Sequence, residues 1–232
     1  LLWYATRTPP TFESEWPYLA TYTLNLRRMY TAFLDNPFFG HLWSLSVEEQ
    51  FYLLWPLVLF FVPARRVVLF FAVVALAGPL VRLGTTTALA SAGMAGEALA
   101  RATISFTPSQ LDAFALGALL LFTPERIRRH TGPLFWTVTG VVVVVRTAIL
   151  AVEHRPLLDT SIGFALASTR YGQLLWGYVL VNAWAASFIL HALYSKGLTA
   201  RLMRSEPLAY LGRISYGVYV LHQIVRYYGR TL

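Results

Sequence analysis

Six apolar segments, each near the length needed to cross a lipid bilayer, dominate this chain. They cover residues 42–62, 67–83, 111–122, 133–152, 172–193 and 208–228. Residues 1–5 are expected to be the end of a seventh segment, and residues 107–110 extend the short third one. A spanning helix needs about 20 mostly apolar residues, and in lipid its backbone groups must be paired within the segment. The sequence therefore predicts an all-α, polytopic transmembrane helix bundle with about six full spans and a partial first one.

Composition supports a membrane protein and excludes several other classes. The chain is 56% hydrophobic and only 13% charged, whereas a soluble domain averages about 25% charged residues. The net charge is +8, but the basic residues cluster between apolar runs and form no nucleic-acid-reading motif. There is no cysteine, so disulfides and cysteine metal sites are excluded. We expect the lipid bilayer as a partner, no nucleic acid and no metal; the oligomeric state is not predicted.

The loops between the segments predict an orientation. Basic loops at 63–66, 124–130 and 195–207 follow the first, third and fifth segments, which places all three in the cytoplasm. The longer segments 6–41 and 84–108, and the shorter 153–171, are then expected outside as loops. We find no repeat, so residues 1–232 are expected to form one membrane domain. The sequence begins within an apolar run, and we expect further helices before residue 1.

The first segment carries two adjacent carboxylates, which are costly at membrane depth. Ser44, Glu48 and Tyr52 are spaced four residues apart and lie on one helical face. This polar stripe favours a role for Glu48 on a substrate or in orienting a catalytic base. The alternative is a capped helix start, with Ser46 as the N-cap and Glu49 completing a capping box. Glu49 fits the cap better, and Glu48 fits the stripe better.

The sixth segment has the same polar character. Ser215, Tyr219 and His222 are spaced at i, i+4 and i+7 and share a helical face. A histidine inside a membrane helix indicates a functional site, although it can also simply bond to a neighbouring helix. Gly212 and Gly217 are expected to permit close helix approach.

Two charged residues occur in the middle segments. Arg82 can extend to the membrane interface or pair with Glu48 across the bundle, and the first is favoured. Asp112 begins the third segment, where it can cap the helix or face a cavity.

Two motifs resemble those of a known family. HLWSLSVEEQFYLLWPLVL at 41–59 is similar to the signature of the membrane acyltransferase type 3 family, which includes bacterial sugar and O-antigen O-acetylases. LGRISYGVYVLHQIV at 211–225 resembles that family's late helix. A weaker match, TPSQLDAFALGALL at 107–120, has Gln110 where the family commonly has arginine. The positions that carry the motifs structurally are Trp43, Ser46, Glu49, Gln50, Phe51, Pro56, Gly212 and Tyr216.

The resemblance implies transfer of an acyl group, often acetyl, from an acyl-CoA donor to a hydroxyl of a glycan or lipid-linked acceptor. It implies about ten helices in the bacterial inner membrane, with the presumed catalytic histidine in helices before residue 1. Glu48 is then expected to be catalytic. The expected substrate-binding residues are Ser44, Tyr52, Arg82, Ser215, Tyr219 and His222. The residues alone also leave open a transporter with an intramembrane Glu/His site, although the two related halves typical of transporters are not evident.

Overall fold

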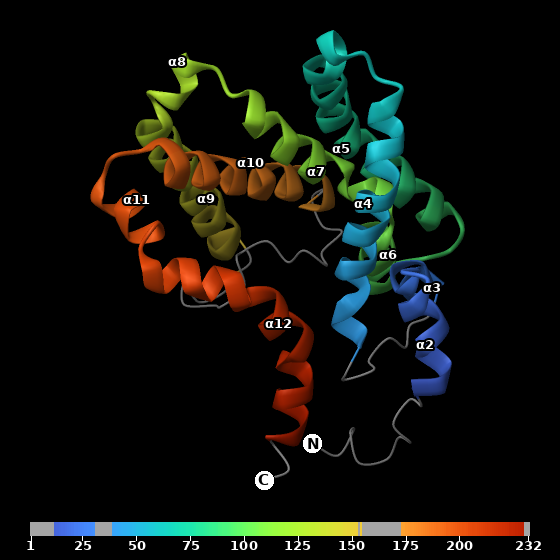
Figure 1. The fold of residues 1–232 in the computed structure, drawn as a ribbon. Coiled ribbons are helices and arrows are strands. Elements are labelled where there is room, and N and C mark those ends of the chain that lie inside the picture. Colours follow the sequence, from blue (N-terminus) through green and yellow to red (C-terminus); the bar gives the residue numbers. More distant parts are fainter. Residues whose placement is uncertain (1–11, 31–38, 153, 155–172, 230–232) are drawn as a thin grey trace.

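The computed structural model describes residues 12–30, 39–152, 154 and 173–229, and throughout this part the regular elements are helical (Figure 1). The first half contains α2 (Phe12–Ala20), α3 (Leu24–Tyr30), η1 (Gly40–Leu42), α4 (Trp43–Phe60), η2 (Ala64–Arg66), α5 (Val67–Ser91) and α6 (Gly96–Ser105). The second half contains η3 (Thr107–Gln110), α7 (Leu111–Leu119), η4 (Leu120–Phe122), α8 (Glu125–Arg128), α9 (Thr131–Val152), α10 (Gln173–Tyr194), α11 (Leu198–Met203) and α12 (Glu206–Tyr228). The predicted all-α class is confirmed; the predicted segment 1–5 lies outside the described residues.

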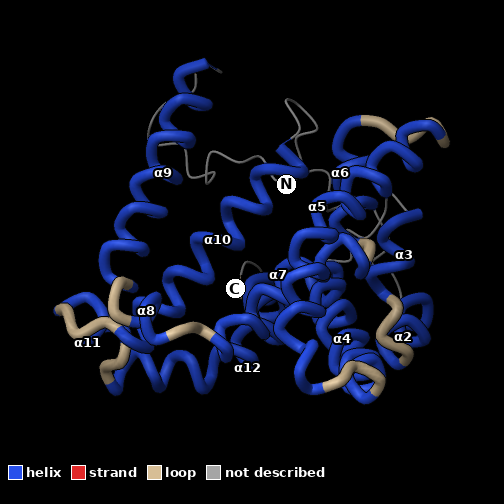
Figure 2. The backbone as a smooth tube through the Cα atoms, turned by 90° about the horizontal axis from the view of Figure 1, so that it is seen from above, coloured by secondary structure: helices blue, strands red, loops and turns tan. Residues whose placement is uncertain are grey.

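The helices form two groups that meet at α7 and α10. Helix α5 packs along α7, and α9 packs along α10, while α10 also contacts α5 and α7. Helices α2 to α6 gather on one side of the molecule and α9 to α11 on the other (Figures 1 and 2). Helix α12 follows α11 and crosses to the start of α4 (Figure 1). There Val220 packs against a small core of Leu24 and Leu42.

Three helical stretches are long and apolar enough to cross a membrane: Ala64–Ser91, Thr131–Val152 and Leu174–Tyr194. A fourth crossing is possible if Gly96–Ser105 and Thr107–Phe122, which meet at an 80° bend, count together. Helices α4 and α12 lie at two further predicted positions but fall outside this set. Their polar residues explain this, since α4 contains two glutamates and α12 contains one glutamate and two arginines.

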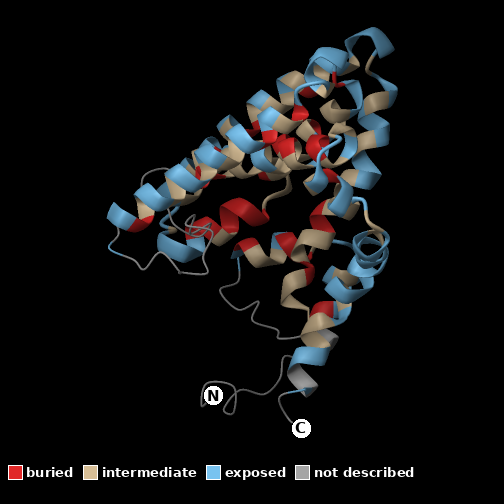
Figure 3. Cartoon of the chain, turned by 90° about the vertical axis from the view of Figure 1, so that its left-hand side faces the viewer, coloured by how far each residue is buried: buried red, intermediate tan, exposed pale blue. Residues whose placement is uncertain are grey.

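The outer surface of the bundle is apolar. Large side chains such as Phe60, Phe61, Leu76 and Leu121 are more than three-quarters exposed. Within the span Thr131–Val152, only 11% of the most apolar window is buried inside the protein. Exposed residues run along the outer faces of the helices in Figure 3, and buried residues gather where helices meet. A water-soluble protein rarely exposes apolar surface on this scale, so these helices are those of an integral membrane protein.

Two regions predicted as loops contain helices. Residues 84–108 hold the last turns of α5 and all of α6, and residues 12–30 hold α2 and α3. The prediction for 84–108 was wrong because the threonines after Gly84 satisfy their hydroxyls within the helix. Thr85 donates to the Val81 carbonyl and Thr86 to the Arg82 carbonyl, each over one turn. Such bonds allow a polar sequence to continue a helix.

Candidate functional site

The two motif helices meet through Tyr219. The Tyr219 hydroxyl donates to the backbone carbonyl of His41 at 2.7 Å, and its oxygen lies 2.5 Å from Ser44 Oγ. Because the phenol proton points to the His41 carbonyl, Ser44 must be the donor in the second bond. A directed chain therefore runs from Ser44 through the Tyr219 hydroxyl to the His41 carbonyl. Two of the predicted substrate-binding residues, 175 positions apart in sequence, are in direct contact.

Two histidines converge on the same backbone oxygen. His41 Nε2 lies 2.9 Å from the Tyr219 carbonyl oxygen, and His222 Nδ1 lies 2.6 Å from it. The rings meet edge to face, with centroids 4.7 Å apart. A carbonyl only accepts, so each of these nitrogens carries its proton, and in the neutral rings the other nitrogen holds the lone pair. We call the set of His41, Ser44, Tyr219 and His222 the junction cluster.

Sequence reasoning did not assign His41 to the site. It precedes α4, and the short η1 turn places its ring against the Tyr219 backbone of α12. Burial is the largest cause that lowers the pKa of His41, and the nearby His222 lowers it further, while hydrogen bonds with the Tyr219 and Val220 backbone oppose the shift. Its Nδ1 is buried and has no hydrogen-bond partner among the described residues. Its only sequence signal was its position at the start of the motif at 41–59.

The rest of the predicted polar stripe lies beyond this cluster. Helix α4 is continuous from Trp43 to Phe60, so Glu48 lies one turn beyond Ser44 and Tyr52 one turn further. Glu48 is half-buried, whereas Tyr52 is 59% exposed. On α12, Ser215 is exposed and donates to the Gly212 carbonyl of its own helix. The structure thus brings Ser44 together with Tyr219 and His222, whereas Tyr52 and Ser215 form no hydrogen bond with these residues.

The capping alternative for the two glutamates was wrong. Helix α4 begins at Trp43 after η1, and its N-cap position is Leu42 without a side-chain cap. Ser46 therefore lies inside the helix, where its hydroxyl donates back to the Leu42 carbonyl at 3.4 Å. Neither glutamate is in the first turn. With η1 preceding it, α4 has its N-cap position four residues earlier than the capping alternative placed it, at Leu42 instead of Ser46.

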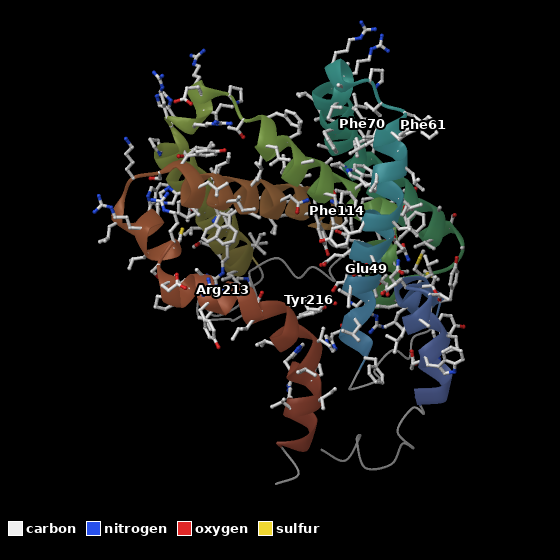
Figure 4. The ribbon with its side chains drawn as sticks, viewed as in Figure 1. Glu49, Phe61, Phe70, Phe114, Arg213 and Tyr216 are labelled. Atoms are coloured by element: carbon white, nitrogen blue, oxygen red, sulfur yellow. The ribbon has the colours of Figure 1, made fainter. Side chains whose placement is uncertain are left out.

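The glycines of α12 do not mark a close helix contact. A Cβ atom added at Gly212 or Gly217 would meet nothing within 4 Å among the described residues. The predicted close approach there was wrong, because α12 leaves the bundle and touches it mainly near Val220. Tyr216, which is 60% exposed, lies on the flank of α12 turned toward α4 in Figure 4, where Glu49 is also labelled.

Arg82 is fully buried and pairs with Asp112. Its Nη2 lies 2.7 Å from each carboxylate oxygen, and Nη2 and Nε both donate to the Ser109 carbonyl. The guanidinium also lies 4.6 Å from the centre of the Tyr178 ring. Both sequence readings of Arg82, interfacial extension and pairing with Glu48, were wrong. The partner was not evident because Asp112 is 30 residues away on a different helix.

A glycine permits this pairing. A Cβ at Gly78 would lie only 2.9 Å from the Asp112 backbone nitrogen, so α5 and α7 approach each other too closely for any larger residue. Arg82 follows one turn later on the same helix and reaches the Asp112 carboxylate from there.

A second polar network holds the bend between α6 and α7. Gln50 Nε2 donates to the Tyr22 carbonyl and to Asn25 Oδ1, and Thr107 Oγ1 donates to Gln50 Oε1. Asn25 Nδ2 donates to the Ser105 carbonyl and to Thr107 Oγ1. The Asn25 bond pairs the Ser105 carbonyl at the bend, and the Gln50 and Asn25 bonds to Thr107 hold the first residue of η3. The motif glutamine therefore positions the bend, a role not predicted for it.

Other motif residues pack against neighbouring elements. Phe51 stacks on Phe114 of α7, with centroids 4.0 Å apart, and the Arg28 guanidinium lies over the Trp43 ring. Phe114 is labelled in Figure 4 beside α4. Pro56 lies inside α4. Gln110, at the position where the family commonly has arginine, donates to the Ile104 carbonyl across the bend.

Among the described residues, no group of three or more histidine, aspartate or glutamate side chains could hold a metal ion. The junction cluster offers proton donors and acceptors instead: two imidazoles, a phenol and a hydroxyl, with Glu48 one helical turn away. Such groups can bind hydroxyls and move protons.

Comparison with known proteins gives the chain a family. A model of acyltransferase family 3, described as an acyltransferase domain, matches residues 1–232. Proteins called O-acetyltransferase OatA from Staphylococcus aureus strains NCTC 8325 and COL are each 26% identical over 190 residues. The match covers 78% of this chain and 28% of each of these relatives, so the chain spans well under half of their length. No solved structure matches the chain.

The family match confirms what the motifs at 41–59 and 211–225 predicted. With its apolar helices and a family model that covers residues 1–232, this chain belongs to the membrane acyltransferase type 3 family.

Proposed function

We propose that this chain forms the membrane part of an O-acyltransferase. It moves an acyl group, most simply acetyl, from acyl-CoA to a hydroxyl of a glycan or lipid-linked acceptor in the bacterial inner membrane. The observation that carries the proposal is the meeting of the two family motifs in the junction cluster, where Ser44 contacts Tyr219. The relatives named O-acetyltransferase support the acetyl group and the oxygen acceptor.

The reaction needs a proton acceptor and a place for hydroxyls. The acceptor oxygen attacks the thioester carbonyl as its proton leaves, and the thiol of coenzyme A departs. Glu48 orients, or balances the charge of, the histidine that takes this proton, as carboxylates do in other histidine-assisted acyl transfers. Ser44, Tyr219 and His222 hold acceptor hydroxyls at the junction cluster.

Three further residues complete the proposed substrate site. Tyr52 on α4 and Ser215 on α12 are exposed and extend the acceptor surface along these two helices. Arg82 has its charge balanced by Asp112, which leaves one guanidinium nitrogen, Nη1, without a partner among the described residues. That nitrogen is the part of Arg82 that can hold a carbonyl or phosphate oxygen.

Replacing Glu48 by glutamine tests the catalytic assignment. The amide keeps the size of the side chain but removes its charge, so we expect acyl transfer to fall by about 100-fold or more while insertion is unchanged. Membrane vesicles containing the intact protein would receive radiolabelled acetyl-CoA, and base-labile label in the glycan fraction would be counted.

Glu49→Gln is the matched control, because the neighbouring glutamate points from a different face of α4. Near-normal transfer by the Glu48→Gln protein would remove Glu48 from the mechanism. Movement of an acceptor glycan across the vesicle membrane without consumption of acetyl-CoA would favour the transporter alternative over the enzyme.

A further inference from the structure

Half of the net positive charge of the chain lies in two short stretches. Residues 124–130 and 195–206 hold six lysines and arginines but only two acidic residues, a net charge of +4 in a chain of +8. These stretches contain α8 and α11, which lie at one corner of the bundle (Figures 1 and 2). Nitrogen-tipped side chains project outward along this side in Figure 4. We call the surface formed by the two stretches the basic corner.

The last turn of α10 holds both stretches in place. From the α8 side, the Arg128 guanidinium lies 4.8 Å from the centre of the Tyr194 ring. From the α11 side, Thr199 Oγ1 lies 2.8 Å from Nε2 of the buried His191. Two basic stretches that are about 70 residues apart in sequence are therefore anchored at the same helix end.

The six cations of the basic corner differ in what they bind. Arg204 donates to three backbone carbonyls at the end of α10, and Arg128 donates to one just before α8. By contrast, Arg126, Lys196 and Arg201 are exposed, and each has no ion-pair or hydrogen-bond partner among the described side chains. Their charge is not balanced within this part of the protein, so it attracts anions from solution.

An exposed aromatic ring lies beside these cations. Trp136, on α9, is 54% exposed, and its ring meets the His191 ring edge to face with centroids 6.4 Å apart. Because His191 is bonded to Thr199 of α11, the indole lies next to the basic corner. Cations bind phosphate oxygens, and an open aromatic face stacks on a nucleobase. The combination suits a nucleotide better than it suits phosphate alone.

We propose that the basic corner binds the nucleotide end of the acyl-CoA donor. Arg126, Lys196 and Arg201 hold its phosphates, and Trp136 stacks on its adenine. This inference rests on the proposed acyl transfer, and it adds a donor site to the acceptor site at the junction cluster. The corner lies on the same side as the basic η2 turn when each long apolar helix crosses once, which is the side where the positive-inside rule places the cytoplasm.

A truncated donor separates nucleotide binding from chemistry. Lys196→Gln combined with Arg201→Gln removes two cations from the corner. We expect KM for acetyl-CoA to rise about 10-fold with kcat unchanged. S-acetyl-pantetheine has the thioester but no nucleotide, so its KM should stay the same in this variant. An equal rise in KM for both donors would overturn the proposal, because the cations would then not act on the nucleotide.

Arg65→Gln combined with Arg66→Gln is the matched control. These two exposed arginines of η2 supply the same number of charges on the same side of the membrane, but away from the basic corner. We expect wild-type KM values with both donors. A rise in KM for acetyl-CoA equal to that of the Lys196/Arg201 variant would contradict the proposal, because it would reduce the corner to general positive charge.

Direct binding provides a readout that does not depend on acyl transfer. The intact protein in neutral detergent should bind radiolabelled adenosine 3′,5′-bisphosphate, and both the Lys196/Arg201 variant and Trp136→Leu should bind it at least several-fold more weakly. If the cations instead hold lipid headgroups, this binding is absent, and the variant differs from the wild type only in bilayers that contain phosphatidylglycerol; that result would overturn the proposal. Nucleotide binding without transfer from either donor would refute the proposed acyl transfer and keep the nucleotide site.

Discussion

Arg82 carries a full positive charge into a part of the bundle that has no solvent contact, and Asp112 balances it. Buried ion pairs contribute little net stability, but removing one partner leaves a costly uncompensated charge. The Ser109 carbonyl and the Tyr178 ring complete the surroundings of the guanidinium. The pair links three helices, because Arg82 belongs to α5, Asp112 to α7 and Tyr178 to α10.

Asp112→Asn should therefore destabilise the protein strongly. The asparagine leaves Arg82 buried and unpaired, which costs about 3–5 kcal/mol in the free energy of unfolding. Denaturant unfolding in detergent would measure the loss. Glu125→Gln, which breaks the exposed Glu125–Arg129 pair, is the control and should change little. Equal stability of the two variants would show that the buried pair does not hold the helices.

A double substitution separates structure from substrate binding. Arg82→Met with Asp112→Leu removes both charges and keeps apolar volume, so the folded protein should be about as stable as the wild type. If Arg82 holds a substrate oxygen, acyl transfer by this stable variant should be lost. Retained transfer would make Arg82 a structural residue only.

The bend between α6 and α7 depends on side chains from other elements. Phe106 has an extended backbone between the two helices, and Asn25 and Gln50 pair the groups exposed there. Gln50→Ala leaves buried donors and acceptors unpaired, so we expect a loss of about 1–3 kcal/mol and faster hydrogen exchange at residues 104–110. Gln223→Ala, at a half-buried glutamine of α12, is the control. Unchanged exchange at the bend would show that other contacts hold it.

The contact between η1 and α12 should weaken in acid. His41 has a pKa below the ordinary value of about 6.5 because it is buried beside His222. The unfolded chain binds the proton more readily, so the stabilising contribution is present above about pH 6.5 and is lost as the pH falls below it.

Spin labels would report this change. The chain has no cysteine, so cysteines at the exposed positions Leu53 on α4 and Val225 on α12 can be labelled cleanly. We expect a narrow distance distribution near pH 8 that broadens below pH 6. The same pair in a His41→Gln background should stay narrow. A pH response that persists without His41 would assign the titration to another group.

For the whole molecule, the order of the helices argues that the bent pair crosses the membrane once. If α5, the bent pair, α9 and α10 each cross the membrane once, the basic stretches at η2, α8 and 195–197 all lie on one side. If the pair instead re-entered, α8 would lie opposite η2, which the positive-inside rule disfavours.

Single cysteines would decide this topology. Variants at Ala64, Ala92, Arg126, His154 and Lys196 would be treated in whole cells with a membrane-impermeant maleimide. One crossing predicts labelling from outside at Ala92 and His154 only. A re-entrant pair predicts labelling at Ala92, Arg126 and Lys196 instead, so the pattern distinguishes the two arrangements.

The sequence by itself determined the helical membrane class, the family and the two motif helices. These depend on local features: continuous apolar runs that must pair their own backbone in lipid, and short motifs read along one helix. The orientation of single side chains within a helix, such as the stripe through Ser44 and Glu48, also followed from the 3.6-residue period. The apolar run placed the start of α4 within one residue, whereas the capping alternative misplaced it at Ser46 because a serine followed by glutamate three residues later also occurs inside helices.

Only the tertiary structure decided which polar residues meet. The pairs Arg82–Asp112 and Ser44–Tyr219, and the convergence of His41 and His222 on one carbonyl, join helices whose packing no local pattern specifies. A buried polar group requires a partner, but its sequence position does not say on which helix that partner lies. Burial and helix packing made those choices, and they turned scattered polar residues into the junction cluster.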